Sequence, residues 1–240
     1  VGGGVRLAYA SEAKALLAVG LAAPRLSAPA LAEFLATHDI DHRPGQTLFL
    51  EIAQVEPGTF LTLRPDGQLR HDRYYRLPLP TADRSLDGAG RAALLGDVDA
   101  LLRDAVRLRL RSDVPLAGSL SGGMDSSLLT ALVRDELRHD AAGPLPYPVL
   151  SCQFRHATVP GDESSYIDQV AAHLGISATA TDGSPLIVVT PTAADLVRDL
   201  DTVLFHQEAP FADTSIVAHY ALLRTARDRG IKVLLSGQGG

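Results

Sequence analysis

Residues 116–127 read Leu116-Ala117-Gly118-Ser119-Leu120-Ser121-Gly122-Gly123-Met124-Asp125-Ser126-Ser127, a short apolar run that turns through adjacent glycines into an amphipathic segment. The apolar residues after the turn recur at helical spacing and are Leu128, Leu129, Leu132, Val133 and Leu137. This pattern predicts a strand, a tight loop and a helix whose first N–H groups lie near Met124 and Asp125. Unpaired N–H groups and the helix dipole favour anions at that end, so the stretch predicts a phosphate-binding loop.

The residues of the loop suit close contact with a polar ligand. Gly122 and Gly123 let the backbone approach a ligand, and Ser121, Ser126 and Ser127 add hydroxyl donors. The loop lacks the Gly-Lys-Ser/Thr ending of a Walker A loop, so it does not predict the γ-phosphate chemistry of that motif. A different nucleotide chemistry is expected.

The composition limits the classes of protein that fit. The chain has 240 residues, of which 46% are hydrophobic, enough for one large domain or two smaller ones. The formal net charge of -6 argues against nucleic acid as the main partner. The single cysteine, Cys152, excludes an internal disulfide and a Cys-based zinc site and favours a reducing cytoplasm. With no long apolar run and no signal peptide, we expect a soluble protein without a membrane partner.

Residues 1–78 predict a helix pair beside an antiparallel meander. The expected helices cover 13–19, with Ser11 as N-cap, and 30–37; the expected strands cover 5–10, 47–55, 59–64 and 68–75. His38, Asp39, Asp41 and His42 have metal-ligating side chains, but a polar turn between helix and strand accounts for the same residues and is the preferred interpretation.

Residues 79–90 are rich in Pro, Gly, Asp and Ser without periodicity and predict a linker. After the linker, a long helix is expected over 91–111, with Leu94, Leu95, Val98, Leu101, Leu102, Ala105 and Leu108 on one side. Strands are then expected at 114–120, 148–154, 176–181, 185–190 and 231–235, alternating with helices at 124–138, 162–174, 192–204 and 214–229. This alternation predicts an α/β fold, with a parallel sheet, helices on both faces and ligands beyond the carboxyl ends of the strands.

Ser-Gly loops follow two of these strands, at 121–123 and at 236–240. Their shared chemistry predicts that both loops line one site. The chain begins Val1-Gly2-Gly3-Gly4 and ends on the second loop, directly after a predicted buried strand. We therefore expect residues 1–240 to be an internal segment of a longer polypeptide. A reading frame with a start codon at Val1 and a stop codon after Gly240 would refute this expectation.

Ser121-Gly122-Gly123-Met124-Asp125-Ser126 resembles the SGGxDS loop of the N-type ATP pyrophosphatases, an α/β group that cleaves ATP between its α- and β-phosphates to adenylate a substrate. Other stretches resemble glutamine-hydrolysing asparagine synthetases, in the order of that family and over nearly the whole chain. They are Ala10-Ser11-Glu12-Ala13-Lys14-Ala15-Leu16-Leu17, Val55-Glu56-Pro57-Gly58, Tyr74-Tyr75, Ser112-Asp113-Val114-Pro115, Asp162-Glu163-Ser164 with Tyr166, His206-Gln207-Glu208-Ala209-Pro210 and Lys232-Val233-Leu234-Leu235-Ser236-Gly237-Gln238-Gly239-Gly240.

The resemblance implies that residues 1–78 are the C-terminal part of an N-terminal-nucleophile glutaminase domain. Residues 91–240 would then be the first part of an ATP-pyrophosphatase synthetase domain, of the adenine nucleotide α-hydrolase type. Such enzymes hydrolyse glutamine with an N-terminal cysteine and use the ammonia to displace AMP from a β-aspartyl adenylate. Val1 is not that cysteine, and Cys152 is expected to be a small core hydrophobe. We expect this segment alone to be inactive.

By matching positions, the resemblance assigns pyrophosphate to Ser121, Gly122, Gly123, Ser126 and Ser127. It assigns Mg²⁺ to Asp125, whose alternative role is to cap the helix, and the adenosine to Leu120, Phe154, Ser236 and Gly237. Gln238 would lie near the acceptor, where asparagine synthetases often have glutamate, and an amide cannot act as a general base. The second magnesium ligand is expected just after Gly240.

The resulting functional hypothesis is an ATP-dependent, glutamine-using ligase that adenylates a carboxylate, with aspartate as the first choice, and transfers ammonia to it. The alternative is a relative that forms an intramolecular amide, such as a β-lactam synthetase or a lasso-peptide cyclase. A third possibility is a non-catalytic nucleotide-binding module. His206 and Glu208 either help to position the acceptor or an ammonia tunnel, or form a helix exit before Pro210. The oligomeric state is left open, with a homodimer as one option.

Overall fold

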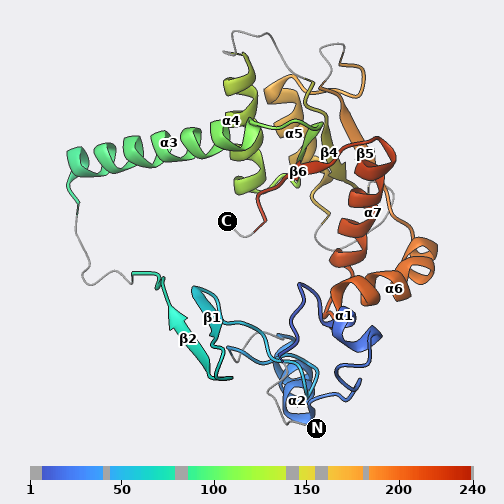
Figure 1. Cartoon of the computed structure of the whole chain (residues 1–240). Helices are drawn as coiled ribbons and strands as arrows, with labels where there is room; N and C mark the ends of the chain where they lie inside the picture. Colours follow the sequence, from blue (N-terminus) through green and yellow to red (C-terminus); the bar gives the residue numbers. More distant parts are fainter. Residues whose placement is uncertain are drawn as a thin grey trace. The chain divides into compact units, whose positions relative to one another are not determined.

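The computed structural model describes residues 7–39, 44–78, 86–138, 146–154, 162–180 and 184–238. The chain divides into two compact units (Figure 1). Unit 1 comprises Val1–Asp83 and Asp201–Asp213, and unit 2 comprises Arg84–Leu200 and Thr214–Gly240. Within the described ranges, no helix is both long enough and apolar enough to cross a membrane.

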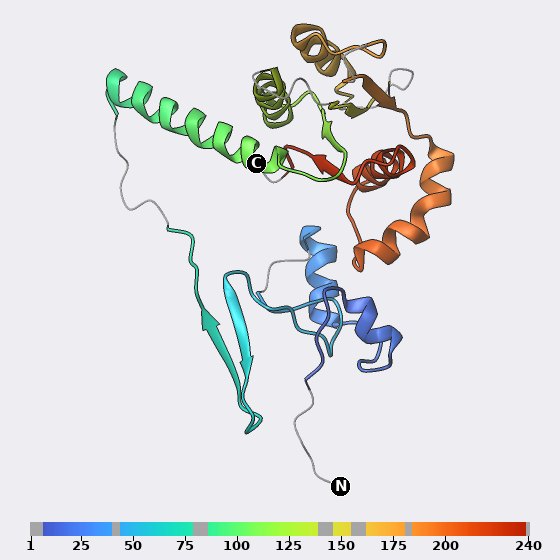
Figure 2. The ribbon, with the colours of Figure 1, turned by 45° about the horizontal axis from the view of Figure 1, so that its top comes forward.

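Unit 1 contains the helices α1 (Ala13–Ala18) and α2 (Ala28–Thr37) and the strands β1 (Thr59–Leu63) and β2 (Leu69–Arg73). The two strands form the predicted antiparallel hairpin, with Thr59 opposite Arg73. Figure 2 shows this hairpin as a long two-stranded ribbon. At its turn, the Asp66 carboxylate accepts the N–H of Gln68 at 2.9 Å, so a side chain supplies a bond that the tight turn needs.

Two strands predicted in unit 1 do not form. The described part of the first, residues 7–10, has no strand, and residues 5 and 6 lie outside the described ranges. The region 47–55 makes only isolated bridges, from Phe49 to Leu26 and from Ala53 to Gln46. The Thr47 hydroxyl accepts the N–H of Phe49 and lies 2.6 Å from the carbonyl oxygen of Ile52. These local bonds fold the segment back on itself and compete with an extended ladder.

The start of α1 and the suggested metal cluster also differ from the sequence-based prediction. Glu12, not Ser11, is the N-cap of α1, and it makes no side-chain capping bond. His38 ends α2 in the left-handed conformation, with φ 62, in keeping with the polar-turn interpretation. No group of three or more His, Cys, Asp or Glu able to hold a metal ion occurs among the described residues. Asp41 and His42 lie outside those residues.

Unit 2 is built on a four-stranded sheet, which confirms the predicted parallel α/β architecture (Figure 1). Its strands are β3 (Leu116–Ser119), β4 (Val149–Cys152), β5 (Leu186–Val189) and β6 (Val233–Leu235), and their order is β5-β4-β3-β6. All three strand pairings are parallel. The chain runs outward from β3 to β5 and returns to the other side of β3. This reversal between β3 and β6 is where sheets of this kind bind ligands.

Helices cover both faces of this sheet (Figure 2). They are α3 (Gly88–Leu110), α4 (Met124–Arg138), α5 (Ser164–Leu174) and α7 (Ser215–Asp228), whereas the residues of α6 (Ala193–Gln207) are divided between the two units. On one face, α3, α4 and α5 contribute to a core of Val106, Leu116, Leu120, Leu132, Val133, Leu137, Tyr147, Val149, Ile167, Ala171 and Ile176. On the other, α7 packs Leu222 and Ala226 against Ala117 and Leu150. The central strands β3 and β4 are therefore buried on both sides, as their apolar residues require, while the edge strands β5 and β6 are partly exposed.

The element boundaries in unit 2 follow local capping bonds. Helix α3 begins at Gly88, earlier than predicted, because the Asp87 carboxylate accepts the N–H of Gly90 at 2.7 Å. The last residues of the predicted linker are thus helical, and residues 79–85 are outside the described ranges. Helix α6 begins with a capping box, since Thr192 and Asp195 exchange bonds at 2.8 and 3.2 Å.

One predicted strand of unit 2 is absent. Residues 176–180 form a turn in which the N–H of Ala180 donates to the carbonyl of Ser177, and Thr181 is not described. Ile176 is nevertheless 4% exposed, because it packs in the core beneath α5. Its apolar side chain therefore reflects burial in a loop, not strand pairing.

Candidate functional site

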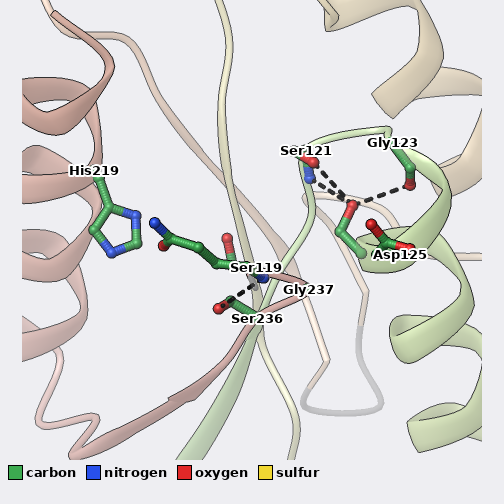
Figure 3. Close-up of a pocket in the computed structure, with 9 residues that line it drawn as sticks. Ser119, Ser121, Gly123, Asp125, His219, Ser236 and Gly237 are labelled. Atoms are coloured by element: carbon green, nitrogen blue, oxygen red, sulfur yellow. Dashed lines mark hydrogen bonds between the residues drawn. The ribbon is translucent and has the colours of Figure 1, made fainter. Parts of the chain in front are cut away.

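The loop between β3 and α4 is held in shape by its own serines (Figure 3). The Ser126 hydroxyl accepts the N–H of Ser121 at 3.2 Å and lies 3.2 Å from the carbonyl oxygen of Gly123, to which it can donate. The Ser127 hydroxyl donates to the same carbonyl at 2.7 Å. Ser126 is buried, at 6% exposed. These bonds hold the loop backbone in its conformation without a ligand, so Ser126 has a structural role in the loop.

Gly122 places the loop directly on α5. Its φ is 84, a left-handed conformation that side chains rarely adopt. A Cβ at this position would lie 2.9 Å from the backbone nitrogen of Ile167 and 3.0 Å from the Cβ of Tyr166. Any other residue would strain the backbone and push the loop away from α5.

Asp125 lies in the first turn of α4, on the cavity side of the loop (Figure 3). Its side chain makes no hydrogen bond or ion pair with any residue that the structure describes. It therefore does not cap the helix, and its carboxylate is available to a ligand. The N–H of Ser127 already donates to the carbonyl of Gly123 at 3.1 Å, but the N–H groups before it in this first turn have no partner within the helix and can donate to an anion.

The loop after β6 touches the start of α4. A Cβ at Gly237 would lie 2.6 Å from the backbone nitrogen of Ser126 and 2.9 Å from the backbone carbon of Asp125. Strand β6 pairs directly with β3, with Gly118 opposite Leu235, so the two loops leave neighbouring strands at the same edge. The two Ser-Gly loops consequently face one cavity, as their places in the sequence predict.

This cavity has a volume of about 220 Å³ and opens at the carboxyl edge of β3 and β6. Its lining residues are Ser119, Ser121, Gly123, Asp125, Ser126, His219, Ser236, Gly237 and Gln238. Asp125 is the one acidic side chain among them, and the lining contains no lysine or arginine from the described ranges. Polar groups from both loops and from α7 therefore meet in a single space.

Four of the predicted site residues do not line the cavity. Leu120 is 1% exposed and belongs to the apolar core. Gly122 packs against α5, and Ser127 bonds to the loop backbone. Phe154 follows β4, where its N–H donates to the Asp162 carboxylate at 3.4 Å. Leu120, Gly122 and Ser127 therefore contribute to the packing and shape of the loop, not to the lining of the cavity. A contact of any of the four with adenosine or pyrophosphate stays a prediction.

His219 and Ser119 line the cavity but were not predicted from the sequence. His219 lies on α7, and its ring faces the cavity, across from the serine loop (Figure 3). Partial burial keeps the pKa of the imidazole below its ordinary value, so the ring is neutral at neutral pH. Ser119 is the last residue of β3 and comes two residues before Ser121 of the loop. Its place at the carboxyl end of a predicted parallel strand was the available signal, because ligands of such sheets bind beyond those strand ends.

Cys152 is no nucleophile in this structure. Burial, together with the negative charge of Asp162, raises the pKa of the Cys152 thiol to about 11. The thiol is therefore protonated at neutral pH, and a protonated thiol is a poor nucleophile. This agrees with its expected role as a small apolar side chain at the end of β4.

Glu208 has a structural role within unit 1. Its carboxylate accepts the N–H of Ala13 at 2.8 Å and that of Lys14 at 2.6 Å, and pairs with the Lys14 ammonium at 3.4 Å. Glu208 thereby caps α1 in place of the predicted Ser11. The His206 ring meets the Phe205 ring edge-on, with centroids 5.6 Å apart. These contacts favour the helix-exit interpretation of the His206–Glu208 stretch over direct ligand binding.

The donor set around Asp125 fits a cation that is held mainly by substrate phosphates. A magnesium ion takes oxygen ligands and commonly uses one or two carboxylates plus phosphate oxygens. Asp125 offers one unpaired carboxylate beside the helix start, while no larger group of metal-ligating side chains gathers within the described ranges. The described residues therefore suit a metal–nucleotide complex better than a metal held by protein alone.

The family match and a similar curated protein both point to asparagine synthetases. Residues 97–240 match the family described as asparagine synthase. An amidase of Penicillium rubens is 29% identical over 234 residues, covering 98% of this chain and 34% of that protein. A glutamine-hydrolysing asparagine synthetase of Bacillus subtilis is 26% identical over 231 residues, covering 96% and 32%. The chain thus spans about a third of the length of these relatives.

A glutamine-dependent NAD⁺ synthetase from Acinetobacter baumannii, solved in complex with ADP, is also similar in structure. The TM-score is 0.35 and the sequence identity 17%, with 72% of this chain and 29% of that chain covered.

Proposed function

Because the chain belongs to the asparagine synthase family, we propose that it carries ATP-binding residues of an enzyme that adenylates a carboxylate and transfers ammonia to it. The observation that carries this proposal is the meeting of the serine loop, the unpaired Asp125 carboxylate and the Gly237 backbone around one cavity. In the proposed assignment, residues 91–240 are the first part of the synthetase domain. Residues 1–78 are the C-terminal part of a glutaminase-type domain.

Pyrophosphate is assigned to the loop and the start of α4. The N–H groups of the first helical turn and the Ser121 hydroxyl are directed donors beside the cavity. They are already held in place by Ser126 and Ser127, so little reorganisation is needed when charge builds on the leaving pyrophosphate. Asp125 would hold magnesium, which when bound offsets that charge. Ser236 and Gly237 would contact the nucleotide from the neighbouring strand end.

The proposed reaction has two steps. An oxygen of the acceptor carboxylate attacks the α-phosphorus of ATP, the bond from that phosphorus to the bridging oxygen breaks, and pyrophosphate leaves. Ammonia then attacks the acyl carbon and gives up a proton, and AMP departs with the bonding electrons to leave an amide. In the complete enzyme, glutamine hydrolysis would supply the ammonia. Cys152, whose thiol is protonated, is not a candidate for that hydrolysis.

Aspartate is the proposed acceptor, and a different carboxylate is the second candidate. Two observations favour a carboxylate other than aspartate as the second candidate. Gln238 lines the cavity with a neutral amide, which cannot serve as a general base, and a relative that covers the same span bears the name amidase. An intramolecular amide-forming enzyme would use the same adenylation without needing ammonia. A nucleophilic cysteine at the N-terminus of the complete protein would favour the glutamine-using reaction.

ATP–pyrophosphate exchange tests the proposal. The complete protein, with Mg²⁺, ATP and labelled pyrophosphate, is expected to exchange label only when a carboxylate acceptor is present. Asp125→Asn should reduce the rate at least about a hundredfold, as expected when a charge-stabilising group is lost from a reacting site. The control is Asp104→Asn, an exposed aspartate on α3, which should keep full activity.

Three other results would change the proposal. Exchange with another carboxylate but not with L-aspartate would select the second candidate. ATP binding without exchange for any carboxylate would indicate a non-catalytic nucleotide-binding module. Full exchange by Asp125→Asn would remove the assignment of the loop.

A further inference from the structure

The cavity has two chemically different walls. One wall is the serine loop with the start of α4, which offers helix N–H groups and the Asp125 carboxylate. The opposite wall comes from β6 and α7 and presents Ser236, Gln238 and His219. Helices α4 and α7 cover opposite faces of the sheet, so the two walls approach the strand ends from different sides.

His219 is held in place by the packing of its helix. Val217, Ala221 and Leu222 are at most 4% exposed and anchor α7 on the sheet. His219 lies between them on the helix and points into the cavity (Figure 3). The anchored helix fixes the backbone position of His219 beside the cavity, and a site carried on a rigid element favours a precise contact.

The His219 ring has unused hydrogen-bonding capacity. Neither ring nitrogen bonds to any residue in the described part of the chain. A neutral imidazole offers one N–H donor and one acceptor, and a half-buried ring with neither satisfied is suited to a polar ligand.

We propose that His219 binds the acceptor of the adenylation reaction, donating a hydrogen bond from its imidazole N–H to the carboxylate that becomes activated. This inference rests on the proposed function and deepens it. It gives His219 an acceptor-binding role and assigns His219 and Gln238 to the acceptor side of the cavity, while Ser236 stays with the nucleotide.

Charge decides which ligand goes to which wall. A polyphosphate carries several negative charges and is best placed at the N-terminus of α4, where N–H groups and the helix dipole favour anions. The opposite wall has only neutral side chains and gives a polyphosphate no comparable compensation. A single carboxylate, in contrast, is well served by one or two neutral donors. If the phosphates bind at the N-terminus of α4, the acceptor carboxylate binds at the opposite wall, beside His219 and Gln238.

The test separates acceptor binding from ATP binding in the complete protein. His219→Ala is expected to raise the KM for L-aspartate about tenfold in pyrophosphate exchange, the range expected for losing a bond to a charged group. The KM for ATP should stay within about twofold. His219→Gln keeps an N–H donor and should recover most of the affinity for L-aspartate. His173→Ala, at an exposed position in the last turn of α5, is the matched control and should behave as wild type.

Each outcome has one meaning. A selective rise in the KM for L-aspartate, recovered by His219→Gln, supports the inference. A tenfold rise in the KM for ATP would put His219 in the nucleotide site and overturn it. Unchanged kinetics would overturn it as well. No exchange by wild type with L-aspartate would remove the proposed aspartate reaction, and the inference with it. A melting temperature equal to that of wild type shows that a kinetic loss is not an unfolding effect.

Discussion

Gly237, just after β6, packs against the backbone nitrogen of Ser126 at the start of α4, where an added Cβ would lie only 2.6 Å away. The neighbouring atom is backbone and cannot swing aside as a flexible side chain would. The contact joins two loops that are far apart in the sequence and sets the distance between the two walls of the cavity.

Gly237→Ala should therefore separate the loops. We expect ATP–pyrophosphate exchange by the complete protein to fall at least tenfold, because a displacement of about 1 Å can cost two orders of magnitude in rate. Gly96→Ala is the control, since a Cβ there meets nothing within 4 Å and Gly96 lies inside helix α3. That change should stabilise the chain by about 0.5–1 kcal/mol and leave exchange intact. Normal exchange by Gly237→Ala would mean that the loop shifts without consequence.

The carboxylate of Glu208 should make the stability of unit 1 depend on pH. Burial alone would raise the pKa of Glu208, but the N–H groups of Lys14 and Ala13 and the Lys14 ammonium outweigh it and lower the pKa below 4.5. A lowered pKa in the folded state means that the stabilisation is complete above pH 4.5 and is lost as the pH falls through the folded-state value.

Glu208→Gln should remove this dependence. We expect a loss of about 1–3 kcal/mol at pH 7, the range for bonds to a charged group, and a flatter acid limb in denaturant unfolding monitored on unit 1. Glu12→Gln removes an exposed partner of the same lysine and should cost less than about 1 kcal/mol. Equal losses for both variants would contradict the capping role of Glu208.

Much of unit 2 could be predicted because its signals are local. The period of the apolar residues, the Thr192–Asp195 capping box and the glycine after α5 each depend on a few neighbouring residues. The regions 47–55 and 176–181 were predicted as strands because they contain β-prone residues. Whether such a run forms a strand depends on a partner strand elsewhere in the chain. In these two regions, local hydrogen bonds of Thr47 and Ser177 form in place of the bonds to a neighbouring strand.

The part of the candidate site that comes from a contiguous stretch of sequence could also be predicted, and the part that depends on non-local packing could not. The serine loop is a contiguous motif, whereas His219 enters the cavity only because β6 pairs with β3 and α7 packs on the opposite face from α4. In the sequence, His219 is one of eight histidines, with apolar neighbours that are typical of a core position. The pairing that gives it a role is non-local, and spacing alone does not reveal it.

Two apolar residues of helix α3 differ in burial, and we expect their replacement to differ in its effect on stability. Its apolar side was predicted from spacing, yet Leu101 is 71% exposed while Val106 is 3% exposed in the core with α4. Val106→Ala should cost about 2 kcal/mol in urea unfolding of this chain, from the lost methyl groups and the cavity left behind. Leu101→Ala should stay within about 0.5 kcal/mol. A similar cost for both would show that Leu101 is covered in solution.

The thiol of Cys152 should resist alkylation at neutral pH. Its pKa is raised to about 11 by burial and by the charge of Asp162, so the reactive thiolate is scarce until the pH approaches that value. Labelling with iodoacetamide at pH 8 should be at least tenfold slower in the native chain than in the chain unfolded by urea, because unfolding restores an ordinary pKa and full access. Asp162→Asn should speed native labelling modestly, since it removes only the smaller of the two causes. Rapid native labelling at pH 8 would mean that the thiolate is stabilised, and Cys152 would return as a candidate nucleophile.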